Sequence, residues 1–338
     1  MCIMFMYVSN CGKKPRNSKL CKPATYKLIM ASNRDEMYTR PSKSAYFWDN
    51  SDSHILAGQD LKELGTWLGI SKHGKLAVLL NVNGCSPPSG LGKPSKKKQG
   101  ENTSRGSLVT GFLRSPSGLA AWTYCTSLCQ DPENLDIRKL YKPFHLITID
   151  IRGRHCECDC TKTTTDASSI RVTHLTNTKS CPDERSVPRY MTPFINACQY
   201  YAFGNSVVDK PFKKVSAGRD EFKNLVSKYC GEEASKANNQ SLKNELVEFL
   251  RCREQHFPDP VCNEHAQSNG IPTEILAQLS SRFVTVPQYG FGTRSQTIII
   301  IDTDNNVRYY AFTMKEPINP EDPVWEESEF KFKLSPPN

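Results

Sequence analysis

No stretch of this 338-residue sequence approaches the ~18 consecutive apolar residues that a membrane-spanning helix needs. The apolar start, MCIMFMYV, is shorter than the core of a secretory signal peptide and has no basic residues before it. N-terminal myristoylation and C-terminal prenylation motifs are also missing. We therefore expect a soluble, cytoplasmic protein whose 14 cysteines stay reduced instead of forming a disulfide framework.

The densest run of positive charge contains no aromatic residue, which argues against nucleic acid as a partner. The sequence carries a net charge of +9, and part of the excess is local. Five basic residues lie in one Ser-, Pro- and Gly-rich stretch: Lys93, Lys96, Lys97, Lys98 and Arg105. We predict a solvated loop at about 86–105, with a localisation or phosphate-binding patch as the alternative.

Apolar runs and their spacing predict an α+β protein. Strands are expected at 2–8, 25–32, 143–151 and 170–177, and hairpins at 66–82 and 296–314, each bounded by turn residues. Spacing typical of helices occurs at 107–113 and 117–129, and from about residue 188 to residue 250. Strands near both ends with helices between them favour one sheet-rich domain over two independent ones.

Polar residues follow several of the apolar runs. In TYKLIMASNRDEMYTRP, residues 25–41, the run ends in Asn33-Arg34-Asp35-Glu36, which forms either a solvated turn or the rim of a site. Asn81 and Asn177 follow two other runs, and Arg294 precedes a third. An asparagine amide can donate to an oxyanion, and an arginine can order a thiolate or hold a carboxylate. Their recurrence favours a site at the rim of a sheet, although each residue alone is typical of a turn.

Cys2 is a candidate nucleophile. Methionine before a small residue is usually removed during synthesis, which would make Cys2 the N-terminal residue. Its α-amine, with a pKa of about 7.7–8.0, could then act as the base for its own thiol. The alternative is a buried apolar cysteine at the start of a strand.

Seven short blocks in the same order, MCIMF, ASNRDE, RPS, GTWLGIS, LAVLLNV, SRGSLV and GFGTRSQTIIIID, resemble the NRDE family over nearly the whole chain, to about Leu334. The resemblance implies a single domain over 1–338, with a four-layer αββα sandwich like that of N-terminal-nucleophile hydrolases. It also implies a catalytic set in which Cys2 is the nucleophile and Asp35 lies near its α-amine. Asn81 and Asn177 would contact the oxyanion and the amine, and Arg294 would be the family's late arginine.

The resemblance also implies a bound ligand, either haem or a lipid-like molecule. Four further residues are predicted to bind it: Asn33, Arg34, Trp67 and His145. Trp67 is expected in the core or a pocket wall, with stacking on haem as the alternative. Haem iron could be ligated by one of the many cysteines or by any of seven histidines: His54, His73, His145, His155, His174, His256 and His265. Cys156, Cys158 and Cys160 would share one face of an extended segment, which suits a soft metal or a redox-sensitive strand edge. Because no fourth ligand is apparent, we predict no structural metal site.

For function, the resemblance implies a trafficking or carrier protein in Golgi organisation, secretion and lipid balance. Such a protein would bind haem or a lipid-like molecule, need no cofactor of its own, and touch membrane surfaces transiently, at the Golgi or the mitochondrion. The alternative is an N-terminal-cysteine amidohydrolase acting on a linear amide or thioester. A third interpretation is a basic scaffold recruited to membranes through Lys96 to Lys98.

Overall fold

The computed structural model describes residues 2–9, 25–82, 104–129, 137–151, 170–178, 189–190, 198–230 and 238–335. The chain divides into two compact units, each built from separated stretches of sequence. Unit 1 comprises Met1–Pro41 and Pro193–Lys333, and unit 2 comprises Ser42–Thr192 and Leu334–Asn338. The predicted basic loop at about 86–105 lies outside the described residues except for 104 and 105. The Cys156–Cys160 motif lies wholly outside them.

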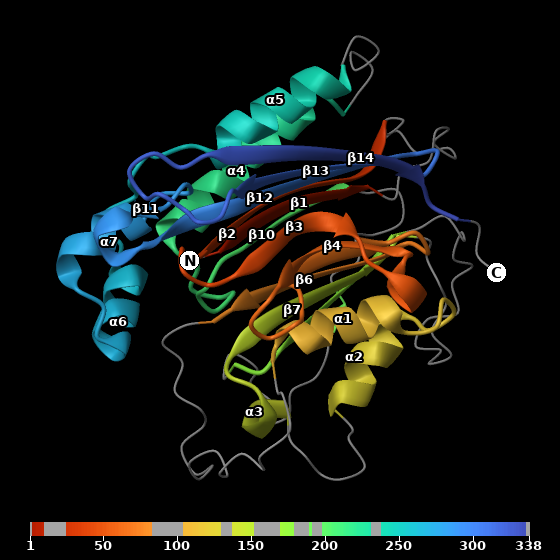
Figure 1. The fold of residues 1–338 in the computed structure, drawn as a ribbon, viewed down its shortest axis with the longest axis horizontal. Coiled ribbons are helices and arrows are strands. Elements are labelled where there is room, and N and C mark those ends of the chain that lie inside the picture. Colours follow the sequence, from red (N-terminus) through yellow and green to blue (C-terminus); the bar gives the residue numbers. More distant parts are fainter. Residues whose placement is uncertain are drawn as a thin grey trace. The chain divides into compact units, whose positions relative to one another are not determined.

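Unit 1 is an antiparallel sheet with helices packed on one face (Figure 1). Its strands, in spatial order, are β10 (Cys198–Phe203), β1 (Ile3–Ser9), β2 (Tyr26–Met37), β12 (Phe291–Asp302), β13 (Asn306–Met314) and β14 (Trp325–Lys333), and β11 (Thr285–Val286) pairs with β12. Its helices are α4 (Lys213–Ser227), α5 (Asn239–Leu250), α6 (Pro260–Asn269) and α7 (Leu276–Leu279), with 3-10 turns η3 (Thr273–Ile275) and η4 (Pro287–Tyr289).

The core of unit 1 lies between this sheet and its helices. On β1, Ile3, Phe5 and Tyr7 alternate toward the helices and are almost fully buried, as the period of two in a strand requires. Phe5 stacks on Phe222 of α4 and meets the edge of Phe249 of α5, with ring centroids 5.8 and 4.9 Å apart. The cluster of aromatic rings fixes both long helices on the sheet.

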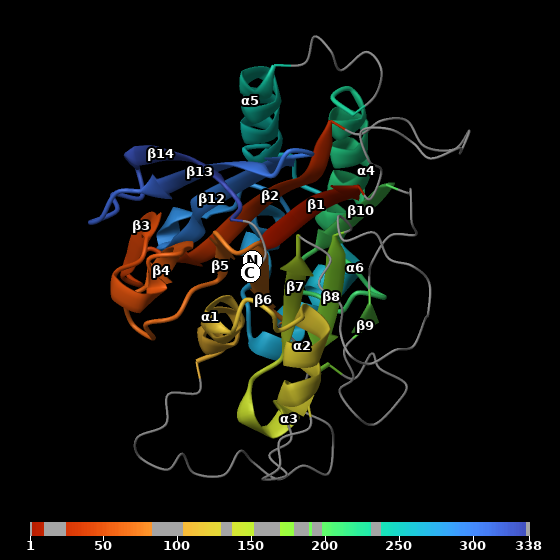
Figure 2. The ribbon, with the colours of Figure 1, turned by 90° about the vertical axis from the view of Figure 1, so that its right-hand side faces the viewer.

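Unit 2 repeats the plan with a second antiparallel sheet and shorter helices (Figure 2). Its strands, in order, are β3 (Ser42–Phe47), β4 (Ile55–Asp60), β5 (Leu68–Ser71), β6 (Lys75–Asn81), β7 (Phe144–Asp150), β8 (Arg171–Thr176) and β9 (Arg189–Tyr190). The other elements are η1 (Asn50–Asp52), α1 (Gly106–Arg114), α2 (Ala121–Cys129) and α3 (Ile137–Leu140). Leu108, Val109 and Phe112 of α1 pack into the core of this unit, as their helical spacing predicts.

The α+β prediction is confirmed by two antiparallel sheets, each with helices of its own. The predicted four-layer αββα sandwich and the predicted single domain over 1–338 depend on how the two units are arranged, so both stay predictions. Two predictions about elements are wrong. The second strand does not stop at residue 32 but continues to Met37, and the stretch from 188 to 250 is not all helical, because it contains β10. Within the described residues, no helix is long and apolar enough to cross a membrane.

Candidate functional site

Cys2 lies directly before β1, at the end of the unit 1 sheet. The next residue, Ile3, pairs with Asn33 of β2, which brings the Cys2 Sγ within 3.7 Å of the backbone oxygen of Asp35. Burial raises the pKa of the Cys2 thiol, and the negative charge of Asp35 acts in the same direction. The resting form of this cysteine is therefore the neutral thiol rather than the thiolate.

Asp35 and Asn33 lie inside β2, so the prediction of a solvated turn at residues 33–36 is wrong, whereas the alternative, the rim of a site, stays a prediction. The Thr293 hydroxyl donates to Asp35 Oδ1 at 2.6 Å. The Asn33 amide donates to the carbonyl oxygens of Leu250 and Arg282, both at 2.9 Å, and Asn33 Oδ1 accepts from the Gln296 side chain at 3.0 Å. The Asn33 amide can be buried in mid-strand because partners from other elements satisfy it.

Arg294 is fully buried and occupies a β-bulge in β12, where the register with β2 shifts between Thr293 and Ser295. Its guanidinium donates to the carbonyl oxygen of Met37 at 3.0 Å and to that of Arg40, and it pairs with Glu316. Arg294 therefore holds the chain as it leaves β2. Arg34 is also buried, and its Nη2 lies 3.6 Å from Glu36 Oε2.

Four predicted site residues belong to unit 2. Asn81 ends β6, where it pairs with Phe144 in register, and Asn177 follows β8. The Asn177 side chain accepts from the Phe144 N–H at 2.9 Å and donates to the Tyr141 carbonyl oxygen at 2.9 Å, which ties β8 to the start of β7. The predicted convergence of Asn81 and Asn177 with Cys2 involves both units and stays a prediction.

His145 and Trp67 are the two predicted ligand-binding residues of unit 2. His145 is buried on β7, and its Nδ1 lies 3.1 Å from His174 Nε2, so one imidazole donates and the other accepts. The Trp67 ring lies against Gly58 of β4, where a Cβ would come within 2.8 Å of the ring carbons. This contact favours glycine at position 58, and a role of Trp67 in ligand binding stays a prediction.

The buried Lys214 of α4 escaped the sequence analysis. Its Nζ donates to the carbonyl oxygens of Leu279 and Ser281 at 2.8 and 2.9 Å. Burial lowers the pKa of Lys214, while nearby negative groups, Asp35 first among them, act in the opposite direction. The sequence did hold a signal, because Lys214 is four and eight residues before Gly218 and Phe222 on the buried face of α4.

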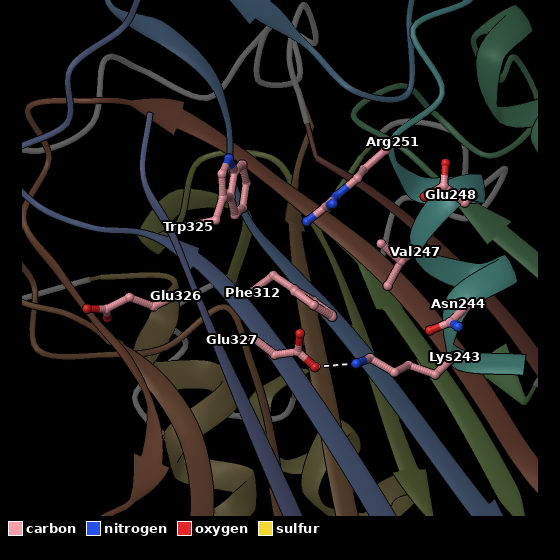
Figure 3. A pocket seen from close by; sticks show the side chains of 9 residues that line it. All are labelled: Lys243, Asn244, Val247, Glu248, Arg251, Phe312, Trp325, Glu326 and Glu327. Carbon is pink, nitrogen blue, oxygen red and sulfur yellow. Dashed lines mark hydrogen bonds and ion pairs between the residues drawn. The ribbon is translucent and has the colours of Figure 1, made fainter. Parts of the chain in front are cut away.

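A groove of about 420 Å³ lies between α5 and the strands β13 and β14 in unit 1. Figure 3 shows Phe312 between Trp325 of β14 and the α5 side chains Val247 and Lys243. The Arg251 guanidinium lies 5.6 Å from the Phe312 ring centroid and 5.8 Å from that of Trp325. The groove thus combines aromatic surface with cationic groups laid over the rings.

The groove was also missed, although its residues have a recognisable spacing. Lys243, Val247 and Arg251 are four residues apart and share one face of α5. Tyr310 and Phe312 alternate on one face of β13, and Lys243 Nζ lies 5.3 and 5.5 Å from their ring centroids. The Lys243 ammonium also pairs with Glu327 of β14, so this salt bridge crosses one end of the groove (Figure 3).

These features define a mixed α+β protein with a cysteine beside a buried carboxylate at one end of a sheet, and with an aromatic, cation-lined groove. The family model described as Transport and Golgi organisation 2 matches residues 1–316, and the chain belongs to this family.

Several curated relatives bear the same name. The Transport and Golgi organization protein 2 homolog of Homo sapiens is 30% identical over 312 residues, which cover 91% of this chain and 93% of that protein. Transport and Golgi organization protein 2 of Drosophila melanogaster is 29% identical over 300 residues, with 87% and 88% covered.

Among solved structures, the chain is similar to the Caenorhabditis elegans ortholog of N-acylethanolamine-hydrolyzing acid amidase. The identity is 8% and the TM-score 0.37, with 88% of this chain and 92% of that one covered. A TM-score of this size does not establish a common fold, so the fold described above is taken from this chain alone.

Proposed function

We propose that this protein acts in Golgi organisation and secretion as a carrier of an amphipathic anion, either haem or a lipid-like acyl compound. Family membership supports the cellular role, since the relatives are named for transport and Golgi organisation. The observation that carries the binding part is the groove of Figure 3. Its volume, about 420 Å³, falls in the range of small-molecule sites.

The lining of the groove suits such a ligand. Trp325 is partly exposed and offers flat apolar surface, Phe312 lies almost buried beside it, and the Arg251 guanidinium lies over both rings. Among the described residues, the one side chain that accepts a hydrogen bond from Arg251 is Gln296, whose Oε1 lies 3.2 Å from Arg251 Nε. The outer nitrogens of Arg251 can therefore receive a carboxylate in the two-pronged geometry that guanidinium favours. Transient contact with membrane surfaces would let the carrier collect its ligand.

The test is a titration of the full-length chain with haem and, separately, with a long-chain fatty acid, followed by haem absorbance and tryptophan fluorescence. We expect saturable binding that weakens about tenfold, or about 1.4 kcal/mol, in Trp325→Ala and in Arg251→Ala. Arg219→Ala is the matched control, because Arg219 is an exposed arginine on α4 that does not line the groove. An absence of saturation with both ligands, or an equal loss in the control, would reject the carrier proposal.

The second candidate function is an N-terminal-cysteine amidohydrolase, favoured by the 3.7 Å approach of Cys2 Sγ to the Asp35 carbonyl oxygen. The raised pKa of Cys2 means less thiolate at neutral pH, so with Met1 retained the thiol should react more slowly than free cysteine. The reaction rate should also rise with pH as the thiol ionises, over a higher pH range than for free cysteine. Removal of Met1 would supply the α-amine as base and make the reaction faster near pH 7.

Intact mass reports whether Met1 is removed, and labelling with an electrophile followed by peptide mapping reports the rate at each thiol. The enzyme interpretation predicts that chains lacking Met1 label at Cys2 well before the exposed Cys198. If such chains label Cys2 no faster than Cys198, the enzyme interpretation fails.

A further inference from the structure

Three side chains with metal-ligating groups meet where α4 passes the segment that follows α5. They are Glu221 of α4, and Glu254 and His256 of the segment, and one ligating atom from each lies within 4.8 Å of the other two. We propose that these residues form a binding site for one divalent metal ion. None of the three lines the groove of Figure 3, so the proposal does not depend on the carrier function.

The histidine provides the clearest sign of a ligand. His256 Nε2 is buried, although the residue as a whole is partly exposed, and it has no hydrogen-bond partner among the described residues. A buried imidazole nitrogen without a partner is unusual, because burial normally requires a donor or an acceptor to replace water. A metal ion bound at this nitrogen would satisfy it.

The local backbone places the two ligands of the segment on one side. Glu254 and His256 are two residues apart in a stretch with neither helix nor strand, and a ligating atom of one lies within 4.8 Å of a ligating atom of the other. The His256 N–H points to the Ser280 carbonyl oxygen at 3.4 Å, which attaches the segment to the end of α7. The spacing Glu-x-His therefore presents a carboxylate and an imidazole together.

Glu221 is held in place by a buried arginine. Arg282 Nη2 donates to Glu221 Oε2 at 2.7 Å, and the Arg282 side chain is only 2% exposed. Its guanidinium also lies 4.4 Å from the Phe249 ring centroid, so it has little freedom to move. Hydrogen bonds of this kind orient carboxylate ligands in metal sites, and the carboxylate keeps lone pairs for an ion.

The donor set indicates the class of ion. Two carboxylates and one imidazole suit Mn²⁺, Fe²⁺ or Zn²⁺, whereas an all-oxygen cage would suit Ca²⁺ and thiolates would favour softer ions. Two negative charges at the site, partly offset by the Arg282 cation, favour a doubly charged ion. Bound there, the ion would cross-link α4 to the segment after α5 and stabilise the folded chain in proportion to its concentration.

The test uses Mn²⁺ as the probe, because this ion binds oxygen and nitrogen ligands and avoids the chain's 14 thiols. Titration of the full-length protein is followed by the electron paramagnetic resonance signal of free Mn²⁺, with thermal unfolding as a second measurement. We expect one ion bound per chain and a rise in Tm. Glu254→Gln and His256→Gln should each weaken binding at least about tenfold.

Glu264→Gln is the control, since Glu264 is an exposed glutamate on α6 outside both the cluster and the groove. Binding that is lost in Glu254→Gln and His256→Gln but kept in Glu264→Gln supports the site, provided that the metal-free Tm of the variants matches that of the parent. No binding at all, binding unchanged in both cluster variants, or an equal loss in the control would overturn the assignment.

Discussion

Two regions of unit 1 use similar residues in opposite ways. At the end of the sheet near Cys2, the polar side chains of Asn33 and Arg294 are fully buried, and they bond to the backbone of other elements. In the groove beside α5, Arg251 is exposed, and Lys243 lies over aromatic rings near the surface. The same guanidinium group therefore fixes the fold in one region and faces solvent in the other.

The comparison teaches how a polar residue can be assigned a role. A buried polar group whose hydrogen bonds all end on the protein holds structure, and removing it leaves its partners unsatisfied. A polar group that keeps free donors at the surface costs little to remove and can receive a ligand. Substitutions of matched residues in the two regions should therefore differ sharply in their effect on stability.

The largest effect is expected for Arg294→Met. The change would leave the carbonyl oxygens of Met37 and Arg40 without their donor and Glu316 without its cation. We expect a loss of about 3–5 kcal/mol in the free energy of unfolding, as is typical when one partner of a buried pair is removed. Urea denaturation of the full chain measures the loss.

Arg251→Met is the matched control, with an expected loss of about 1 kcal/mol or less, because Arg251 is at the surface and loses one hydrogen bond, to Gln296. Equal losses in the two variants would contradict the contrast between the regions.

A smaller effect is expected for Asn33→Leu. Leucine has a similar size but cannot donate to the Leu250 and Arg282 carbonyl oxygens, nor accept from Gln296. We expect a loss of about 2 kcal/mol in the free energy of unfolding, since buried groups left unsatisfied keep their desolvation cost. Asn244→Leu in the exposed groove wall serves as the comparison and should change stability by less than about 0.5 kcal/mol.

Asn33 also shows where reasoning from the sequence stops, when it is compared with the strands that the sequence predicted correctly. Apolar runs bounded by turn residues correctly predicted the strand at 75–82 and the hairpin at 296–314, where most residues of the strands are buried. The same reasoning failed at residues 33–36, because an Asn-Arg-Asp-Glu run is typical of a turn. The partners that make Asn33 compatible with a strand, Leu250 and Arg282, lie 217 and 249 residues away along the chain.

The candidate site was predicted only in part for a related reason. Only the family resemblance implied that Asp35 lies near Cys2, and in the structure the pairing of β1 with β2 brings the two residues together. The groove required knowing that α5 lies over β13 and β14, and the metal-ligating cluster required α4 to pass the segment after α5. Packing between distant elements decides such contacts, and the spacing within one element does not reveal them.

The smallest effect is expected where the groove itself carries a salt bridge. Lys243 is 12% exposed and pairs with Glu327, which is 47% exposed, so water screens the interaction from one side. A double-mutant cycle with Lys243→Met and Glu327→Gln should give a coupling energy below about 1 kcal/mol, and the coupling should fall further in high salt. The aromatic rings beneath the lysine explain why Met is the chosen replacement, since its apolar chain can keep the packing on Tyr310 and Phe312. A coupling as large as the loss in Arg294→Met, and insensitive to salt, would mean that the groove is built as a rigid part of the fold, and the distinction between the two regions would then fail.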